Sequence, residues 1–164
     1  MSTDILFEEI QGTDRKNIRN FFKVTAGIFI IALILNLIIK KGNFSNIATA
    51  LFVGIIICII AGIFSDIRLI TQIRTDGIYV RFIPFEFSFS VYSWDNIQEI
   101  YIRKFDPLTT GIGIRMTPVG RAYVFSGDTG IQIVCKNGSK LLIGTQCPDE
   151  IADILHKLGK FRKK

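Results

Sequence analysis

The residue types that most often carry chemistry are sparse in this sequence. Its 164 residues include one histidine, His156, and three cysteines, Cys58, Cys135 and Cys147, with no CxxC spacing. This set matches neither a zinc site nor a disulfide framework. Cys147 precedes a predicted helix, where a thiol pKa can fall, but no histidine stands beside it in sequence to act as a base. We therefore predict no catalytic, cofactor-binding or metal-binding residue, no cofactor and no enzyme activity.

Positive charge is the clearer functional feature. The formal net charge is +6, and five basic residues fall in the last eight positions: Lys157, Lys160, Arg162, Lys163 and Lys164. Such a cluster can contact anionic lipid at a membrane surface. It can equally cap a C-terminal helix and keep the tail soluble. Both interpretations stay open, and we expect no nucleic-acid partner.

Two long stretches near the N-terminus lack any charge. Residues 24–39 and 46–64 measure about 24 Å and about 28 Å as helices, against roughly 30 Å of bilayer hydrocarbon. The mean hydropathy of the chain is +0.39. A buried helix of a soluble protein normally shows a polar stripe, which neither stretch has. The pattern predicts a transmembrane hairpin with spans at about 21–39 and 46–64.

The charges that flank these stretches predict their orientation. Only Lys40 and Lys41 lie in the connection, whereas seven basic residues lie outside it: Arg15, Lys16, Arg19, Lys23, Arg68, Arg74 and Arg81. The excess of flanking cations predicts a two-pass protein of the cell membrane with both termini in the cytoplasm.

Small residues recur every fourth position in the second stretch. Ala50, Gly54, Cys58 and Gly62 would share one helix face, where another helix can approach closely. We predict that this face packs against the first stretch of the same chain, with a homo-oligomer contact as the alternative.

Residues 65–164 have the pattern of a small antiparallel sheet. Polar residues alternate with Phe85, Phe87, Phe89 and Val91, which predicts a half-buried strand, and Asn137-Gly138 is typical of a type I′ hairpin. Further runs predict seven or eight strands near 67–75, 78–83, 86–92, 97–104, 111–116, 121–125, 130–136 and 139–144.

A helix is predicted after the strands. Pro148 suits its first position, acidic residues follow, and apolar residues recur at helical spacing: Ile151, Ile154, Leu155 and Leu158. The predicted organisation is an N-terminal segment at 1–23, a helical hairpin at 24–64 and a β domain at 65–164.

Several short motifs resemble the bacterial pleckstrin-homology-like (PH-like) domains of small two-pass membrane proteins. They are FEEIQ at 7–11, SWDNI at 93–97, GIGIR at 111–115, AYVFSG at 122–127, GIQI at 130–133 and LIGTQCPDE at 142–150. The resemblance implies an α+β fold: a two-helix transmembrane hairpin, then a PH-like antiparallel β-barrel or sandwich of about seven strands with a C-terminal helix. It implies no activity.

These observations suggest a membrane-anchored binding or scaffold module without catalysis. Its expected partners are the lipid bilayer and a protein segment, bound by strand addition or in a groove. One alternative is a sensor of the anionic membrane surface that uses the basic tail. Another is an accessory subunit of a membrane enzyme complex.

Overall fold

The computed structural model describes residues 4–12, 15–39, 44–64, 67–118 and 120–160. The chain divides into two compact units. Residues 1–12 and 68–164 form the first, here called the β unit, and residues 13–67 form the second, the helical unit. The predicted N-terminal segment 1–23 is thus divided between the two units.

The helical unit consists of two helices that contact each other, α1 (Arg15–Ile39) and α2 (Phe44–Phe64). Over the described residues, neither these helices nor any other combine the length and the apolar character needed to cross a membrane. The prediction of spans at 21–39 and 46–64 is therefore contradicted. So are the cell-membrane location and the cytoplasmic placement of both termini. In α1 the four cations of the first nine residues leave an uncharged stretch of only about 24 Å.

The β unit begins with a strand that the sequence did not predict. Strand β1 (Ile5–Gly12) pairs antiparallel with β2 (Arg68–Arg74), and Gly12 lies opposite Arg68. The helical unit is therefore inserted between two neighbouring strands. Phe7, Glu9 and Gln11 point inward from β1, and two of these three are polar. A search for apolar alternation consequently passes over this strand.

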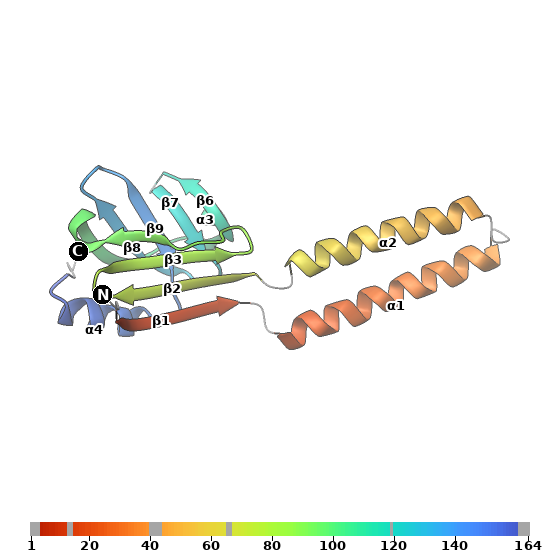
Figure 1. Ribbon diagram of the computed structural model, residues 1–164, viewed down its shortest axis with the longest axis horizontal. Helices are drawn as coiled ribbons and strands as arrows, with labels where there is room; N and C mark the ends of the chain where they lie inside the picture. The colour runs from red at the N-terminus through yellow and green to blue at the C-terminus, as the bar shows by residue number, and fades with distance from the viewer. Residues whose placement is uncertain (1–3, 13–14, 40–43, 65–66, 119, 161–164) are drawn as a thin grey trace. The chain divides into compact units, whose positions relative to one another are not determined.

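Strands β1 and β2 continue into the first sheet through β3 (Gly77–Ile83) and β4 (Ser90–Ser93), in the order β1-β2-β3-β4 (Figure 1). The predicted strand over 86–92 is wrong in its first half. The chain turns after β3, where the backbone N–H of Glu86 donates to the carbonyl of Phe82 at 2.9 Å. Phe85 and Phe87 are exposed as a result.

A short 3₁₀ helix, η1 (Trp94–Asn96), leads into the second sheet. Its strands are β5 (Ile97–Lys104), β6 (Gly113–Thr117), β7 (Gly120–Val124), β8 (Thr129–Cys135) and β9 (Lys140–Gly144). The spatial order is β5-β8-β9-β7-β6, with the four-residue helix α3 (Pro107–Thr110) between β5 and β6.

Strand β9 lies between β8 and β7, and it is parallel to β7. Close approach of the backbones makes this arrangement possible. A Cβ atom at Gly120 would lie 2.0 Å from the carbonyl oxygen of Lys140. The predicted fold class is therefore wrong in three respects: the described strands number nine in sheets of four and five, one pair is parallel, and the helices are not membrane spans.

The C-terminal helix α4 (Pro148–Lys157) lies where the sequence predicts it, with Pro148 in its first turn. Ile151 and Leu155 are fully buried, and the helix contacts β1 and β8. Strand residues that face each other between the sheets complete the core: Leu69, Ile73, Ile78, Val80, Phe82, Ile100, Ile131, Ile133, Tyr123, Leu141 and Ile143.

Candidate functional site

The turn between β3 and β4, residues 84–89, is held by one carboxylate; we call it the aromatic loop. Glu86 Oε1 accepts hydrogen bonds from Arg121 Nη2 at 2.8 Å and from the Tyr123 hydroxyl at 2.7 Å. Glu86 Oε2 accepts from the backbone N–H of Phe82 at 3.2 Å. Charge-assisted bonds of this kind are roughly twice as strong as neutral ones. They fix the loop to β7 of the second sheet.

Because Glu86 points toward β7, its neighbours point away from it. Phe85 is exposed, and Phe87 is 94% exposed. The next phenylalanine in the loop, Phe89, instead packs edge-to-face against Tyr79 with ring centroids 6.2 Å apart. The aromatic loop therefore exposes Phe85 and Phe87, while Glu86 and Phe89 anchor it.

The tyrosine in this anchor donates its hydroxyl proton to Glu86, and its oxygen lies 3.4 Å from Ser90 Oγ, which can donate to it. Burial raises the pKa of Tyr123 far above its ordinary value of 10, and the hydrogen bond to Glu86 raises it further. The hydroxyl keeps its proton at neutral pH. Glu86, Arg121 and Tyr123 thus form a structural anchor. At neutral pH Tyr123 lacks the phenolate that would act as a nucleophile.

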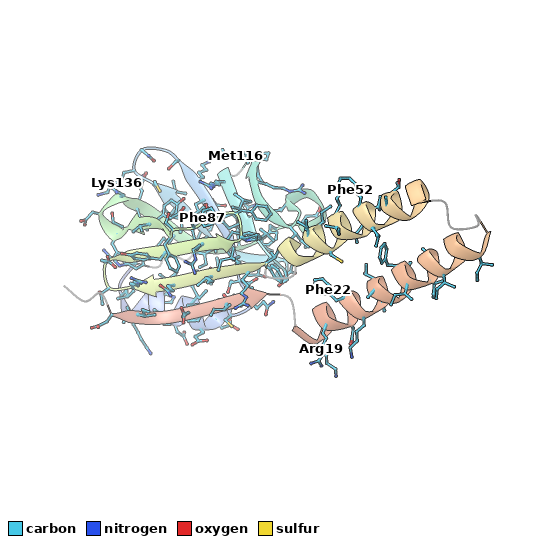
Figure 2. All side chains as sticks on the ribbon, turned by 45° about the vertical axis from the view of Figure 1, so that its right-hand side comes forward. Arg19, Phe22, Phe52, Phe87, Met116 and Lys136 are labelled. Atoms are coloured by element: carbon cyan, nitrogen blue, oxygen red, sulfur yellow. The ribbon has the colours of Figure 1, made fainter. Side chains whose placement is uncertain are left out.

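The edge strand β6 lies next to this anchor. Met116 of β6 and Arg121 of β7 are cross-strand partners, so their side chains share one face of the sheet. Met116 is 81% exposed, and Ile112 just before the strand is also exposed (Figure 2). Exposed apolar side chains thus adjoin each partner of the Glu86–Arg121 ion pair: Phe85 and Phe87 next to Glu86 in sequence, and Met116 opposite Arg121.

The other sheet edges carry features that discourage pairing with another chain. Strand β5 has a register shift between Ile97 and Glu99, β4 has four residues, and β1 is contacted by α4. Strand β6 pairs with β7 without a register shift over its five residues, and it carries the exposed Met116.

The predicted basic cluster is only partly described. Lys157 ends α4 and Lys160 follows it, and both are exposed. The backbone N–H of Lys160 donates to the carbonyl of Leu155 at 2.9 Å, which terminates the helix. Arg162, Lys163 and Lys164 lie outside the described residues.

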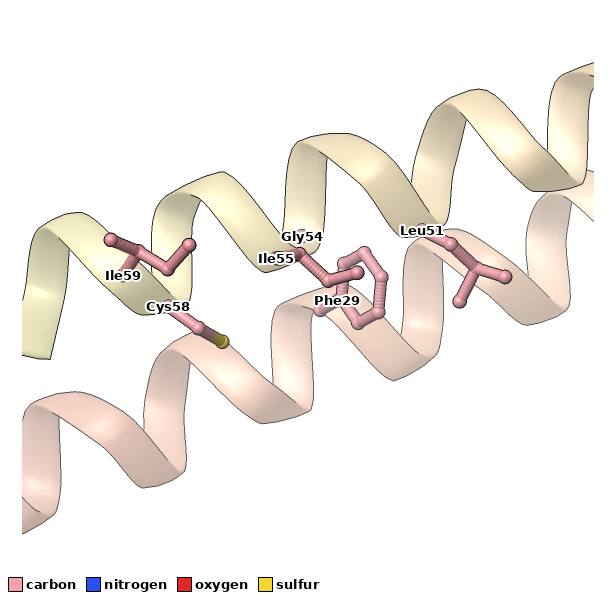
Figure 3. Close-up of a pocket in the computed structure, with 6 residues that line it drawn as sticks. All are labelled: Phe29, Leu51, Gly54, Ile55, Cys58 and Ile59. Atoms are coloured by element: carbon pink, nitrogen blue, oxygen red, sulfur yellow. The ribbon is translucent and has the colours of Figure 1, made fainter.

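The predicted helix-packing face is brought against α1 at one position. Phe29 of α1 lies against Gly54, where an added Cβ atom would approach the ring to 2.3 Å (Figure 3). An added Cβ at Gly62 would meet nothing within 4 Å, and the side chain of Ala50 is outside the described part. An open apolar groove of about 370 Å³ is lined there by Phe29, Leu51, Gly54, Ile55, Cys58 and Ile59.

The three cysteines belong to different segments of the chain. Cys58 is exposed on α2 and Cys135 is buried at the end of β8. The pKa of Cys147 is raised by desolvation, and further by the charges of Glu9 and Glu150. This is opposite to the fall that a position before a helix suggests. Within the described ranges, no three His, Cys, Asp or Glu side chains gather as metal ligands would.

Sequence reasoning missed the role of Glu86. It lies within the run Phe85-Glu86-Phe87, which alternates as a strand does, and alternation placed it on a solvated face. Its long-range partner Arg121 is 35 positions away, a separation that local pattern cannot detect. The useful observation would have been Pro84, which disfavours a central strand.

Comparison with known proteins adds no assignment: no family model, no curated protein and no solved structure matches this chain.

Proposed function

We propose that the β unit is a binding module that captures an extended protein segment at β6, beside the aromatic loop. This proposal rests on the exposure of Phe87, which adjoins Glu86 in sequence, and of Met116, which is the cross-strand partner of Arg121. Large exposed apolar side chains gathered at one place are typical of interaction sites.

The free edge of β6 supplies the main-chain groups for such binding. A strand that ends a sheet leaves a row of N–H and C=O groups unpaired, and an incoming segment can satisfy them as an additional strand. On the face of the sheet at Gly113, an added Cβ would meet no described atom within 4 Å. Main-chain pairing would provide affinity, and Phe85, Phe87 and Met116 would select apolar side chains of the partner.

The ion pair explains why the surface is ready for binding. Arg121 and Glu86 hold the loop in one position before any partner arrives, so little conformational entropy is lost on association. The phenyl rings also carry few rotatable bonds, which lowers this cost again.

A site-specific crosslinking experiment tests the proposal. Photoreactive p-benzoylphenylalanine is placed at Phe87, Met116 or, as a control, Gln98 on the opposite edge strand β5 of the full chain in living cells. We expect a discrete adduct from positions 87 and 116 and none from 98.

A second substitution then tests the strand edge itself. Met116→Lys places a charge on the edge, which natural edge strands use to prevent pairing, and should abolish the adduct from position 87. Gln98→Lys adds the same charge to the other edge and should leave that adduct unchanged. Adducts that survive Met116→Lys, or that form equally at position 98, would reject binding at β6.

A further inference from the structure

The outer face of the first sheet carries a cluster of two arginines and two aromatic rings, here called the arginine–aromatic cluster: Arg74, Tyr79, Arg81 and Phe89. The Arg81 guanidinium carbon lies 4.7 Å from the Phe89 ring centroid. The Arg74 guanidinium carbon lies 4.1 Å from the Tyr79 centroid and 5.8 Å from that of Phe89. Two cations therefore flank a single phenylalanine.

Three described arginines of the β unit, Arg74, Arg81 and Arg121, lie over aromatic rings, but their hydrogen-bond acceptors differ. Arg121 lies over Tyr123 and pairs with Glu86 at 2.8 Å. Arg74 Nε donates to Gln72 Oε1 at 3.0 Å. Arg81 makes no hydrogen bond or ion pair with any residue that the structure describes, and its buried Nε lacks an acceptor.

An arginine that has neither an acceptor nor a counter-charge is energetically unfavourable. The buried Nε is out of reach of a ligand, but the guanidinium as a whole is a partly desolvated charge that gains from a counter-charge at its terminal nitrogens. Stacking on Phe89 fixes the plane of the guanidinium. Arg81 is therefore held in one orientation without the anion that such a group normally meets.

Two acidic residues near the cluster each accept a hydrogen bond from a residue other than Arg81. Glu8 accepts a hydrogen bond from Gln72 Nε2. Asp76 accepts one from the Tyr79 hydroxyl at 2.6 Å. Neither carboxylate bonds to Arg81, so no acidic residue that the structure describes next to the cluster serves as its counter-charge.

The residues at the margin of the cluster indicate which kind of ligand would suit Arg81. Ile10, Ile70 and Arg81 are successive cross-strand partners and share one row of the sheet face. Ile10 is exposed at one side of the cluster, and Val91 is exposed at the other. A carboxylate flanked by apolar side chains complements this surface in both charge and polarity.

We propose that Arg81, stacked on Phe89, binds a carboxylate of an acidic protein segment that lies across the outer face of the first sheet. The binding is noncovalent and uses the two terminal nitrogens of the guanidinium, the geometry that matches a carboxylate. The proposal does not depend on binding at β6, which lies in the other sheet.

The purified full chain tests this with a fluorescent peptide of alternating Glu and Leu residues, measured by anisotropy at low salt. A Gln–Leu peptide of equal length and inorganic phosphate serve as separate probes. We expect saturable binding of the Glu–Leu peptide and at least about tenfold weaker binding by Arg81→Gln, the loss expected for one charged hydrogen bond. Arg103→Gln on β5 removes an equal charge and should not change the affinity.

Arg81→Lys keeps the charge but not the planar fork, and it should bind with intermediate affinity. It also keeps the test decisive if Arg81→Gln unfolds, which the thermal midpoint of each variant will show. Equal binding of both peptides, or equal affinity of Arg81→Lys and the unsubstituted chain, would overturn the proposal. Arg81-dependent binding of phosphate without binding of the Glu–Leu peptide would overturn it as well.

Discussion

The hydroxyl of Thr145, just after β9, donates a 2.6 Å hydrogen bond to Oε2 of Glu9 in β1, 136 positions earlier in the chain. The other carboxylate oxygen of Glu9 accepts from the backbone N–H of Gln146 at 2.8 Å and from Gln11 Nε2 at 3.0 Å. Gln11 Nε2 also donates to the carbonyl of Gly144 at 2.8 Å. A buried polar network thus ties the N-terminal strand to the end of the second sheet.

Removing the carboxylate at the centre of this network should destabilise the β unit. Glu9 is 8% exposed, and Glu9→Ala leaves the donors of Thr145 and Gln146 without their acceptor. We expect the free energy of unfolding to fall by about 2–4 kcal/mol, since several buried groups lose a charged partner. Urea denaturation followed by the fluorescence of Trp94 measures the change.

Glu8→Gln is the matched control, because Glu8 is the next residue and faces the opposite side of β1. It is exposed, and a glutamine oxygen can still accept the hydrogen bond from Gln72. Its effect should stay within about 0.5 kcal/mol. Equal effects of the two substitutions would show that the network does not stabilise the fold.

The pairing of Gly12 with Arg68 predicts that the helical unit can be removed. An Asn-Gly turn that joins these two positions would replace residues 13–67 by a two-residue hairpin connection. We expect this shortened chain to fold and to unfold in urea in one cooperative transition, because both units are compact by themselves.

A fragment that starts at Arg68 provides the contrast. It lacks β1 and with it the Glu9 network and Phe7, so it should lose the cooperative transition. A fragment as stable as the joined chain would show that β1 is dispensable.

The sequence predicted those elements that local pattern determines. Asn137-Gly138 predicted the position of the β8–β9 hairpin, and Pro148 predicted the start of α4, because turn and helix-start preferences act over a few residues. The turn type differs from the predicted I′, because the backbone N–H of Gly138 donates to the carbonyl of Cys135 and so places Lys136 and Asn137 at the centre of the turn. The parallel pairing of β7 with β9 depends on the absence of a side chain at Gly120 opposite Lys140. No local pattern shows that approach, so the sheet order could not be predicted.

The membrane prediction and the strand over 86–92 are wrong for a shared reason. In both, a local apolar pattern does not by itself determine whether the side chains are buried, exposed or in lipid. Phe85 and Phe87 alternate as buried residues do, yet Glu86 pairs with Arg121 and turns them outward. The candidate site was missed because it depends on this long-range ion pair.

Ionisation of Tyr123 should make stability depend on pH under alkaline conditions. Its pKa in the folded state lies well above the value of 10 expected in the unfolded chain, mainly because of burial. The neutral form is therefore favoured by folding. The stability that results is complete below pH about 10 and is lost as the pH rises further. Denaturation midpoints between pH 9 and pH 11 should decrease accordingly.

Tyr123→Phe removes this ionisation and should flatten the decrease. Tyr79 and Tyr92 also have raised pKa values, because of the hydrogen bond to Asp76 and because of burial respectively, so part of the slope remains. Ionisation of Tyr123 can lower the free energy of unfolding by at most about 1.36 kcal/mol per pH unit. If Tyr123→Phe shows the same decrease as the unsubstituted chain, the tyrosine ionises without opposing the fold.

Two glycines of α2 should respond in opposite directions to the same substitution. Gly→Ala in a helix normally adds about 1 kcal/mol of stability. At Gly62 nothing opposes this gain, because the added Cβ would meet no atom within 4 Å. At Gly54 the added Cβ would overlap the Phe29 ring, with overpacking that typically costs about 1–3 kcal/mol. We expect Gly62→Ala to raise, and Gly54→Ala to lower, the thermal midpoint of the helical signal at 222 nm.

Phe29→Leu in the Gly54→Ala background tests the cause. A shorter side chain at position 29 relieves the overlap, so the double variant should regain part of the lost midpoint, while Phe29→Leu alone should lower it by removing the ring from the groove. Rescue of this kind requires that Gly54 and Phe29 meet in the folded chain. If the two substitutions add independently, α1 and α2 do not pack at Gly54.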